Sequence, residues 1–213
     1  FSNIQINEHA GIVLIRRALD FRVFVKQWAS VFHLQEMTGH GKRQSIQFFD
    51  QHGDAVLKVY ATENTDMAAW QQLIAEYHAE PSAEFSVIPA TAATFASEID
   101  SARLETEWRA MTDVHQFFRL LKKHDVSRPQ AFHAVSDDLA QQIGNQSLAT
   151  LLENVRQDGN EIMIFVGNRA CVQIFTGQIE KLMPMHGWLN IFNPAFTLHL
   201  QDQQIAESWI TRK

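Results

Sequence analysis

Apolar and polar residues alternate along the first part of the chain in short bursts that are typical of β-strands. The bursts read IQI, GIVLI, FRVFV, ASVFHL, SIQFFD and AVLKVYA, and they predict a meander of antiparallel strands. The segment Gln51–Asp54, which contains Gly53, predicts a hairpin turn between the last two. Further on, apolar residues recur at helical spacing and predict a helix over 66–78, capped by Asn64 and Thr65.

A change of composition then divides the chain. Residues 80–99 are rich in Pro, Ala, Ser and Thr, and two prolines prevent a continuous helix, so this segment is expected to be a linker. Periodicity predicts the helices that follow it, over 100–111, within the stretch 108–125 that contains His115, and over 129–135, 137–143 and 147–157. Strands resume with EIMIFV and ACVQIF, and IEKLMPM, GWLNIF, AFTLHL and IAESWIT complete a second meander.

A weak internal repeat organises these elements. The segment from Gly11 to Val23 aligns with the segment from Gly187 to Leu200 at an offset of about 177 residues. We therefore expect an α+β fold of two pseudo-repeats, each an antiparallel meander sheet with helices packed at one side. Residues 1–79 would be the later part of the first repeat and 100–213 the earlier part of the second, and both ends look cut from a longer chain.

Composition narrows the possible functions. The 213 residues are 46% hydrophobic, which allows a substantial core, and the net charge of −6 gives little support for nucleic-acid binding. The only cysteine is Cys171, so no intrachain disulfide can form and a reducing, cytoplasmic compartment is expected. The apolar runs are too short to cross a bilayer, so we expect a protein that is not membrane-embedded.

The stretch WRAMTDVHQFFRLLKKHD offers the most specific chemistry. His115 lies beside an apolar stripe of Val114, Phe117, Phe118 and Leu121, and Thr112 or Asp113 can cap the helix. Phe118, Arg119 and Lys122 share the face of His115. One nitrogen ligand, an aromatic wall and two cations suit a flat dianionic ligand with a central metal. The residue types alone leave open that His115 is an ordinary boundary residue.

Strand phase singles out Arg22. Leu19, Phe21 and Val23 share one face of their strand, whereas Asp20, Arg22 and Phe24 share the other. Arg22 could therefore contact a ligand beside an aromatic ring, or it could face solvent and pair with Asp20 or Glu36. The remaining histidines show no zinc-binding spacing.

Six segments resemble the HemS/ChuS/HmuS family of bacterial haem-utilisation proteins, and the resemblance extends in order along nearly the whole chain: LDFRVFVKQW, SIQFFDQHGDAVLKVYAT, TDVHQFFRLLKKH, VGNRACVQIFTG, GWLNIFNPAFTLHL and IAESWITRK. The resemblance implies that haem binds in a cleft between the repeats. It implies that His115 is the axial iron ligand and that Arg22 is a catalytic residue on the opposite face of the haem. Phe24 and Phe165 match residues lining that side, and Gln130 matches a polar residue near the haem.

Three functions are compatible with these residues. The resemblance implies an enzyme that degrades haem or releases its iron with NAD(P)H or another external reductant. It equally implies a carrier or chaperone that passes haem on, with an inner-membrane haem importer or a downstream haem acceptor as partner. A module that binds another amphiphile is the third possibility. Propionate contacts are expected partly in segments beyond this sequence, and the oligomeric state is left open.

Overall fold

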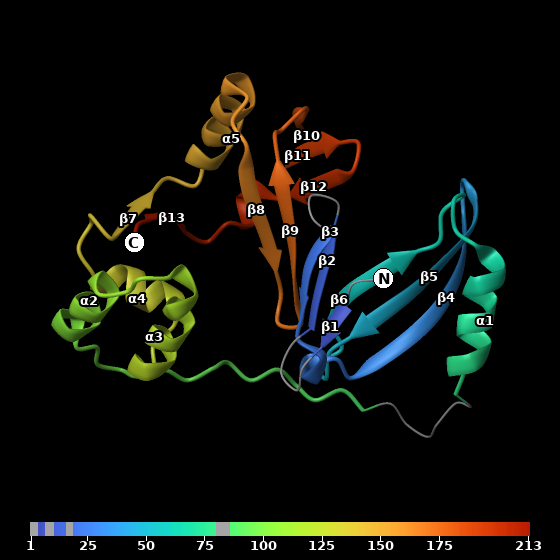
Figure 1. Ribbon diagram of the computed structural model, residues 1–213, viewed down its shortest axis with the longest axis horizontal. Coiled ribbons are helices and arrows are strands. Elements are labelled where there is room, and N and C mark those ends of the chain that lie inside the picture. Colours follow the sequence, from blue (N-terminus) through green and yellow to red (C-terminus); the bar gives the residue numbers. More distant parts are fainter. Residues whose placement is uncertain (1–3, 7–10, 16–18, 80–85) are drawn as a thin grey trace. The chain divides into compact units, whose positions relative to one another are not determined.

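The computed structural model describes residues 4–6, 11–15, 19–79 and 86–213, which form two compact units. The first unit comprises Phe1–Thr91 and Ile162–Gly177, and the second comprises Ala92–Glu161 and Gln178–Lys213. Both mix antiparallel sheets with a few helices, so the predicted α+β class is confirmed (Figure 1). Among the described residues, no helix has the length and apolar character needed to cross a membrane.

A five-stranded antiparallel sheet forms the centre of the first unit. Its order is β1-β2-β3-β9-β8, with β1 at Ile4–Ile6, β2 at Gly11–Ile15, β3 at Leu19–Val23, β9 at Cys171–Gly177 and β8 at Ile162–Gly167. Phe21, Val23 and Cys171 are buried on one face, where Val25, Trp28 and Leu57 pack against them. The 3-10 helix η1, Val25–Gln27, follows β3 directly.

A separate sheet completes this unit. It contains β4 at Ser30–Thr38, β5 at Gly41–Phe49 and β6 at Ala55–Tyr60. The predicted hairpin turn is confirmed, with Gly53 at a φ of 81°. The predicted single meander is wrong, because β3 pairs with β9 rather than β4. Helix α1, Met67–Tyr77, lies beside this sheet, where Trp70 contacts His33; Asp66 caps it, rather than Asn64 or Thr65.

The second unit begins with a cluster of short helices (Figure 1). These are α2 at Ser101–Arg109, the 3-10 helix η2 at Val114–Gln116, α3 at Phe117–His124 and α4 at Arg128–Ala134. Their shared core contains Leu104 and Ala131, neither of which is exposed to solvent, and the buried Trp108. The region around His115 therefore rests on a dense apolar cluster.

The predicted helix over 137–143 is wrong. Residues Ala140–Ile143 instead form strand β7, which pairs with the strand β13, Ser208–Thr211. This pairing supplies backbone hydrogen bonds from a segment far along the sequence and overrides the local pattern. Helix α5, Ser147–Asp158, was predicted within one residue of its end.

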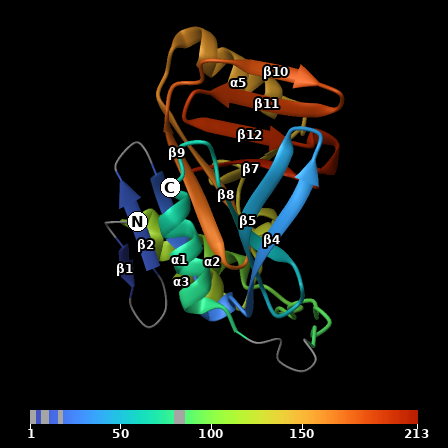
Figure 2. The same ribbon diagram turned by 90° about the vertical axis from the view of Figure 1, so that its right-hand side faces the viewer.

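A three-stranded sheet lies beside α5 in the same unit (Figure 2). It contains β10 at Leu182–Met185, β11 at Trp188–Asn193 and β12 at Phe196–Leu200, and the 3-10 helix η3, Asp202–Gln204, follows. The second predicted meander is therefore divided, because β8 and β9 join the first unit and β13 pairs with β7.

The element order supports the predicted repeat. Two strands, a 3-10 turn and a third strand occur as β2, β3, η1 and β4, and again as β11, β12, η3 and β13 at the offset of about 177 residues. The boundary between the two units in the linker lies at Thr91 and Ala92, within the predicted range 80–99. The hairpin β8–β9, however, packs with the first unit rather than with residues 100–213. The repeat itself stays a prediction.

Candidate functional site

His115 lies in the 3-10 helix η2, which directly precedes α3. The sequence predicted that His115 lies inside a continuous α-helix, and this prediction is wrong. Asp113 caps η2 as expected, and its carboxylate accepts the backbone N–H of His115 at 2.7 Å. Gln116 completes a capping box, because its Oε1 accepts the backbone N–H of Thr112 at 2.9 Å and that of Asp113 at 3.3 Å. The residues on both sides of His115 are thereby held in place.

The imidazole of His115 is accessible, and its orientation is fixed. Its Nδ1 lies 2.6 Å from Asp113 Oδ1, and its side chain is 88% exposed. A carboxylate can only accept, so Nδ1 carries the proton and donates, which leaves the lone pair of the neutral ring on Nε2. The hydrogen bonds from the backbone and ring of His115 also lower the pKa of Asp113. The exposed ring thus has one nitrogen, Nε2, whose lone pair is available to a metal ion.

The apolar surroundings of His115 differ from the predicted stripe. Val114 and Phe118 are 61% and 67% exposed, whereas Leu120 is buried and Phe117 and Leu121 pack partly against the core. A 3-10 turn advances three residues per turn, so the residues before Phe117 do not continue the stripe of α3. Phe118 lies within α3, near its start, and its ring is largely exposed to solvent.

A cation that the sequence pattern did not identify lies over these rings. The guanidinium of Arg128, at the start of α4, is 5.4 Å from the ring centre of Phe118 and 5.9 Å from that of Phe117. Arg128 is separated from Phe118 by a helix end and a turn, so no helical spacing links the two in the sequence. The exposed ring and the cation together suit an anionic aromatic ligand.

Arg22 lies on the face of its sheet opposite the core, as predicted. Phe21 and Val23 are each 5% exposed on the core face; the side chain of Leu19 lies outside the described residues. Arg22 forms an ion pair with Asp20 on the same strand face, which is the solvent-side pairing considered in the sequence analysis. The guanidinium therefore has a carboxylate partner on its own strand.

The sheet brings Phe165 to the face of Arg22. Phe165 pairs in register with Ile174, which pairs with Asp20, so the three side chains point to one side. Phe165 is 58% exposed and Met163, two residues earlier, is 53% exposed. On the described part of this face, exposed apolar side chains therefore share the sheet surface with the Arg22–Asp20 ion pair. Phe24 follows β3 as the N-cap of η1, and its backbone N–H donates to Ala170 O at 2.8 Å.

Gln130 has a structural task. Its Oε1 accepts the backbone N–H of Ser127 at 2.9 Å, and its Nε2 donates to Ala96 O at 3.2 Å. The side chain thereby starts α4 and holds the end of the linker. A contact between this amide and a ligand would have to replace one of these hydrogen bonds, and the expected role stays a prediction.

The five residues divide between the two units. Arg22, Phe24 and Phe165 belong to the first unit, and His115 and Gln130 belong to the second. Arg22 and Phe165 lie on one face of the five-stranded sheet and Phe24 follows β3 directly, whereas His115 and Gln130 lie within the helical cluster. Asp113, which holds the imidazole, was foreseen only as a helix cap.

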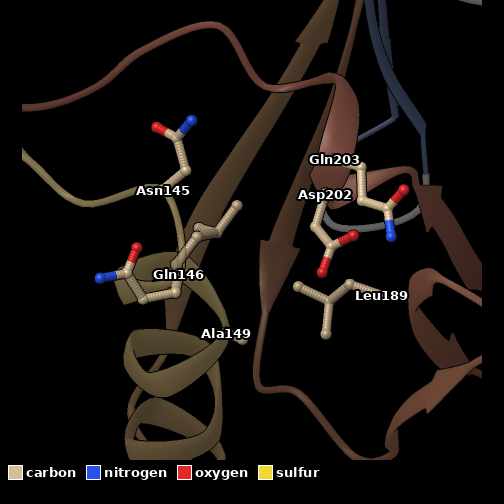
Figure 3. A pocket seen from close by; sticks show the side chains of 7 residues that line it. Asn145, Gln146, Ala149, Leu189, Asp202 and Gln203 are labelled. Carbon is tan, nitrogen blue, oxygen red and sulfur yellow. The ribbon is translucent and has the colours of Figure 1, made fainter.

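Two cavities lie elsewhere. One of about 170 Å³ is found where α5 begins, next to β11 and η3, and is lined by Asn145, Gln146, Leu148, Ala149, Leu189, Asp202 and Gln203 (Figure 3). It is smaller than the roughly 300 Å³ at which ligand pockets usually begin. The other, of about 380 Å³, is lined by residues of β6, β8 and β9, including Cys171, and by Asn168 in the turn between β8 and β9. The five predicted residues line neither cavity.

Comparison with known proteins places the chain in a family. The family model described as "Haemin-degrading HemS.ChuX domain" matches residues 1–77 and 125–213. The hemin transport protein HmuS of Yersinia pestis is 56% identical over the whole chain, and the hemin transport protein HemS of Yersinia enterocolitica is 55% identical. The chain spans 62% of the length of each. His115 lies between the two matched stretches, so the assignment does not depend on it.

Solved structures agree with this assignment. The crystal structure of ChuS, described as an E. coli heme oxygenase, is 58% identical and has a TM-score of 0.90 over 100% of this chain and 64% of its own. Holo-PhuS, described as a heme-binding protein from Pseudomonas aeruginosa, is 37% identical, with a TM-score of 0.92 over 99% of this chain and 62% of its own. The chain therefore belongs to the HemS/ChuX family of haem-utilisation proteins.

Proposed function

We propose that this chain binds haem and that Nε2 of His115 is the axial ligand of the iron. The observation that carries the proposal is the exposed imidazole whose Nδ1 is already committed to Asp113. A neutral imidazole with a free Nε2 is a common haem ligand, and the second nitrogen of such a ligand ordinarily donates to a nearby acceptor. The descriptions of the relatives as haem-binding and haem-degrading proteins support haem as the substrate.

The neighbours of His115 suit the rest of the ligand. Phe118 offers an exposed ring for an apolar macrocycle, and Arg128 over that ring offers a charge for a carboxylate. Arg119 and Lys122, which the sequence placed on the same face, are exposed. An exposed aromatic ring and nearby cations are the groups that the sequence analysis expected around a flat dianionic ligand.

Arg22, Phe24 and Phe165 are proposed as further haem contacts. A guanidinium remains charged at physiological pH and can donate several hydrogen bonds, so Arg22 could hold an oxygen-containing ligand of the iron. Phe165 and Met163 provide exposed apolar surface on the same sheet face. Arg22 would then exchange its bond to Asp20 for a bond to that ligand, or share its donors between the two.

Haem titration followed by absorption spectroscopy tests the ligand assignment. Wild type should develop a Soret band typical of an imidazole-ligated iron, and His115→Ala should lose it. His40→Ala is a matched control, because His40 is exposed in the turn before β5. An unchanged band in His115→Ala would contradict the proposal.

We propose further that the bound haem is degraded or releases its iron, with Arg22 as the residue that promotes this reaction. Bound haem would supply the iron-centred redox chemistry, and the protein would orient it and place hydrogen-bond donors. The alternative is a carrier that binds haem without chemistry, and the Arg22–Asp20 ion pair favours it, because that pairing already occupies the guanidinium. A cytoplasmic location and an importer or acceptor partner belong to either version.

A turnover assay separates enzyme from carrier. NAD(P)H or another reductant is added to the purified haem complex in air, and tetrapyrrole products and free iron are followed over time. Degradation by wild type that is lost in Arg22→Gln, with the Soret band retained, supports the enzyme. Stable haem under all conditions, together with transfer to an apoprotein acceptor, supports the carrier.

A further inference from the structure

We propose that Asp113 is a positioning residue for the haem iron: its carboxylate fixes the tautomer and ring angle of His115 and makes Nε2 a stronger electron donor. This inference rests on the proposed function, in which His115 is the iron ligand. It assigns to Asp113 a role beyond the helix cap that its place in the sequence suggests.

The geometry around one oxygen carries the inference. Asp113 Oδ1 accepts both the backbone N–H of His115 at 2.7 Å and its ring Nδ1–H at 2.6 Å. The two bonds close a small ring through the backbone and side chain of one residue, so the imidazole cannot rotate about its bonds without losing one of them. A single carboxylate thus orients the whole ligand.

The position of Asp113 is itself held by its neighbours. Gln116 Oε1 accepts the backbone N–H of Asp113 at 3.3 Å, and Gln116 Nε2 donates to Thr112 Oγ1 at 3.3 Å. Lys213, at the end of the chain, donates to Thr112 O. The turn that carries the carboxylate is therefore held by several hydrogen bonds, and the carboxylate is ionised at neutral pH.

The charge of this acceptor has a chemical consequence. An anionic oxygen at Nδ1–H pulls the proton away from the ring and increases the electron density at Nε2. The more electron-rich nitrogen stabilises ferric iron more than ferrous iron, because the ferric ion carries one more positive charge. Asp113 should therefore lower the reduction potential of the bound iron and favour ferric over ferrous haem.

Replacement of Asp113 by Asn separates this role from helix capping. Asn is as good an N-cap as Asp and can still accept the backbone N–H, but it is neutral. Loss of a partner of this kind typically costs about 10–100-fold in metal affinity. If ferric affinity falls tenfold more than ferrous affinity, the potential rises by about 59 mV, which is the one-electron equivalent of a tenfold change.

The experiment uses the whole chain loaded with haem. Spectroelectrochemistry gives the potential, and resonance Raman spectroscopy of the ferrous form gives the iron–Nε2 stretching frequency. For Asp113→Asn we expect a higher potential and a lower stretching frequency than for wild type. Asp125→Asn removes the same charge at the other end of α3, where the left-handed backbone at φ 52° also suits Asn, and it should change neither quantity.

Unchanged values in Asp113→Asn, or equal shifts in Asp125→Asn, would overturn the role of Asp113 and leave His115 as ligand untouched. If His115→Ala keeps the ligated Soret band of wild type, the proposed function fails, and the inference fails with it. Circular dichroism verifies that each variant is folded.

Discussion

Haem should restore the thermal stability of a variant that is destabilised in the helical cluster, because His115 rests on that cluster. Leu104 of α2 is fully buried among Trp108, Leu120 and their neighbours. Leu104→Ala removes three carbon atoms from this core and should destabilise it by about 3 kcal/mol, within the roughly 2–5 kcal/mol seen for such changes. For a chain of this size that loss corresponds to a fall in Tm of about 6–12 °C.

Under the proposed function, haem would bind only the folded site and would therefore stabilise it by mass action. At a free concentration 100 times its Kd, the gain is about 2.7 kcal/mol, which nearly offsets the loss at Leu104. Differential scanning fluorimetry or calorimetry of Leu104→Ala with and without haem should therefore recover most of the wild-type Tm. The rescue should disappear in the double variant Leu104→Ala/His115→Ala.

The control for nonspecific effects is the double variant Leu104→Ala/His40→Ala, in which the rescue should persist. Equal rescue with and without His115 would show that haem stabilises the fold through some other contact. No rise of Tm in any variant would refute the reasoning that links haem to this cluster. Free haem that adheres to unfolded chain reduces the effect in all variants alike, so the difference between them is the decisive quantity.

Three further predictions concern single residues. The hydrogen bonds from Lys123, then His124 and Arg103, lower the pKa of Glu107 from 4.5 to about 2, so its stabilising effect is complete above pH 4.5 and is lost as pH falls toward 2. Denaturant unfolding between pH 5 and 2 should therefore be less pH-dependent in Glu107→Gln. Gly53→Ala should cost about 1 kcal/mol in a melt, because φ is 81°, and leave haem titration unchanged. Asp20→Asn should accelerate haem turnover in the reductant assay if its pairing holds Arg22 back; slower turnover would contradict this.

The local elements of this fold were largely readable from the sequence. The turn at Gly53 and helix α5 depend on nearby residues, and both were located correctly. The partner of β3 was not readable, because its neighbour β9 lies about 150 residues further along the chain. The same holds for β7, whose sequence AQQI resembles a helix and becomes a strand only because β13 supplies a partner.

The sequence was sufficient to predict the residue types of the candidate site and the strand face on which Arg22 lies. Alternation correctly placed Arg22 opposite Phe21 and Val23, since side chains on a strand alternate between faces. The bond from His115 to Asp113 was not foreseen, although the pattern Asp-x-His before a helix was visible. Its two-residue spacing permits the bond, but side-chain rotation decides whether it forms. Arg128 approaches Phe118 only because α4 packs against α3.

The order of elements matches between the two predicted repeats, but the polar side chains at the corresponding positions differ. At the offset of about 177 residues, Arg22 on β3 corresponds to His199 on β12. Arg22 pairs with Asp20, whereas His199 Nδ1 lies 2.7 Å from Asn190 Oδ1. Asn190 Nδ2 donates to the carbonyls of Met183 and Trp188, so its oxygen must accept and His199 must donate.

A cation on one strand thus corresponds to an imidazole of fixed tautomer on the other. The packing of both strands depends on what they share, because the spacing of strands and the alternation of apolar residues determine how they pack. The chemistry follows from the single residue at each position. For this reason the roles proposed for Arg22 and Asp113 rest on their own contacts and cannot be transferred to the corresponding positions of the other repeat.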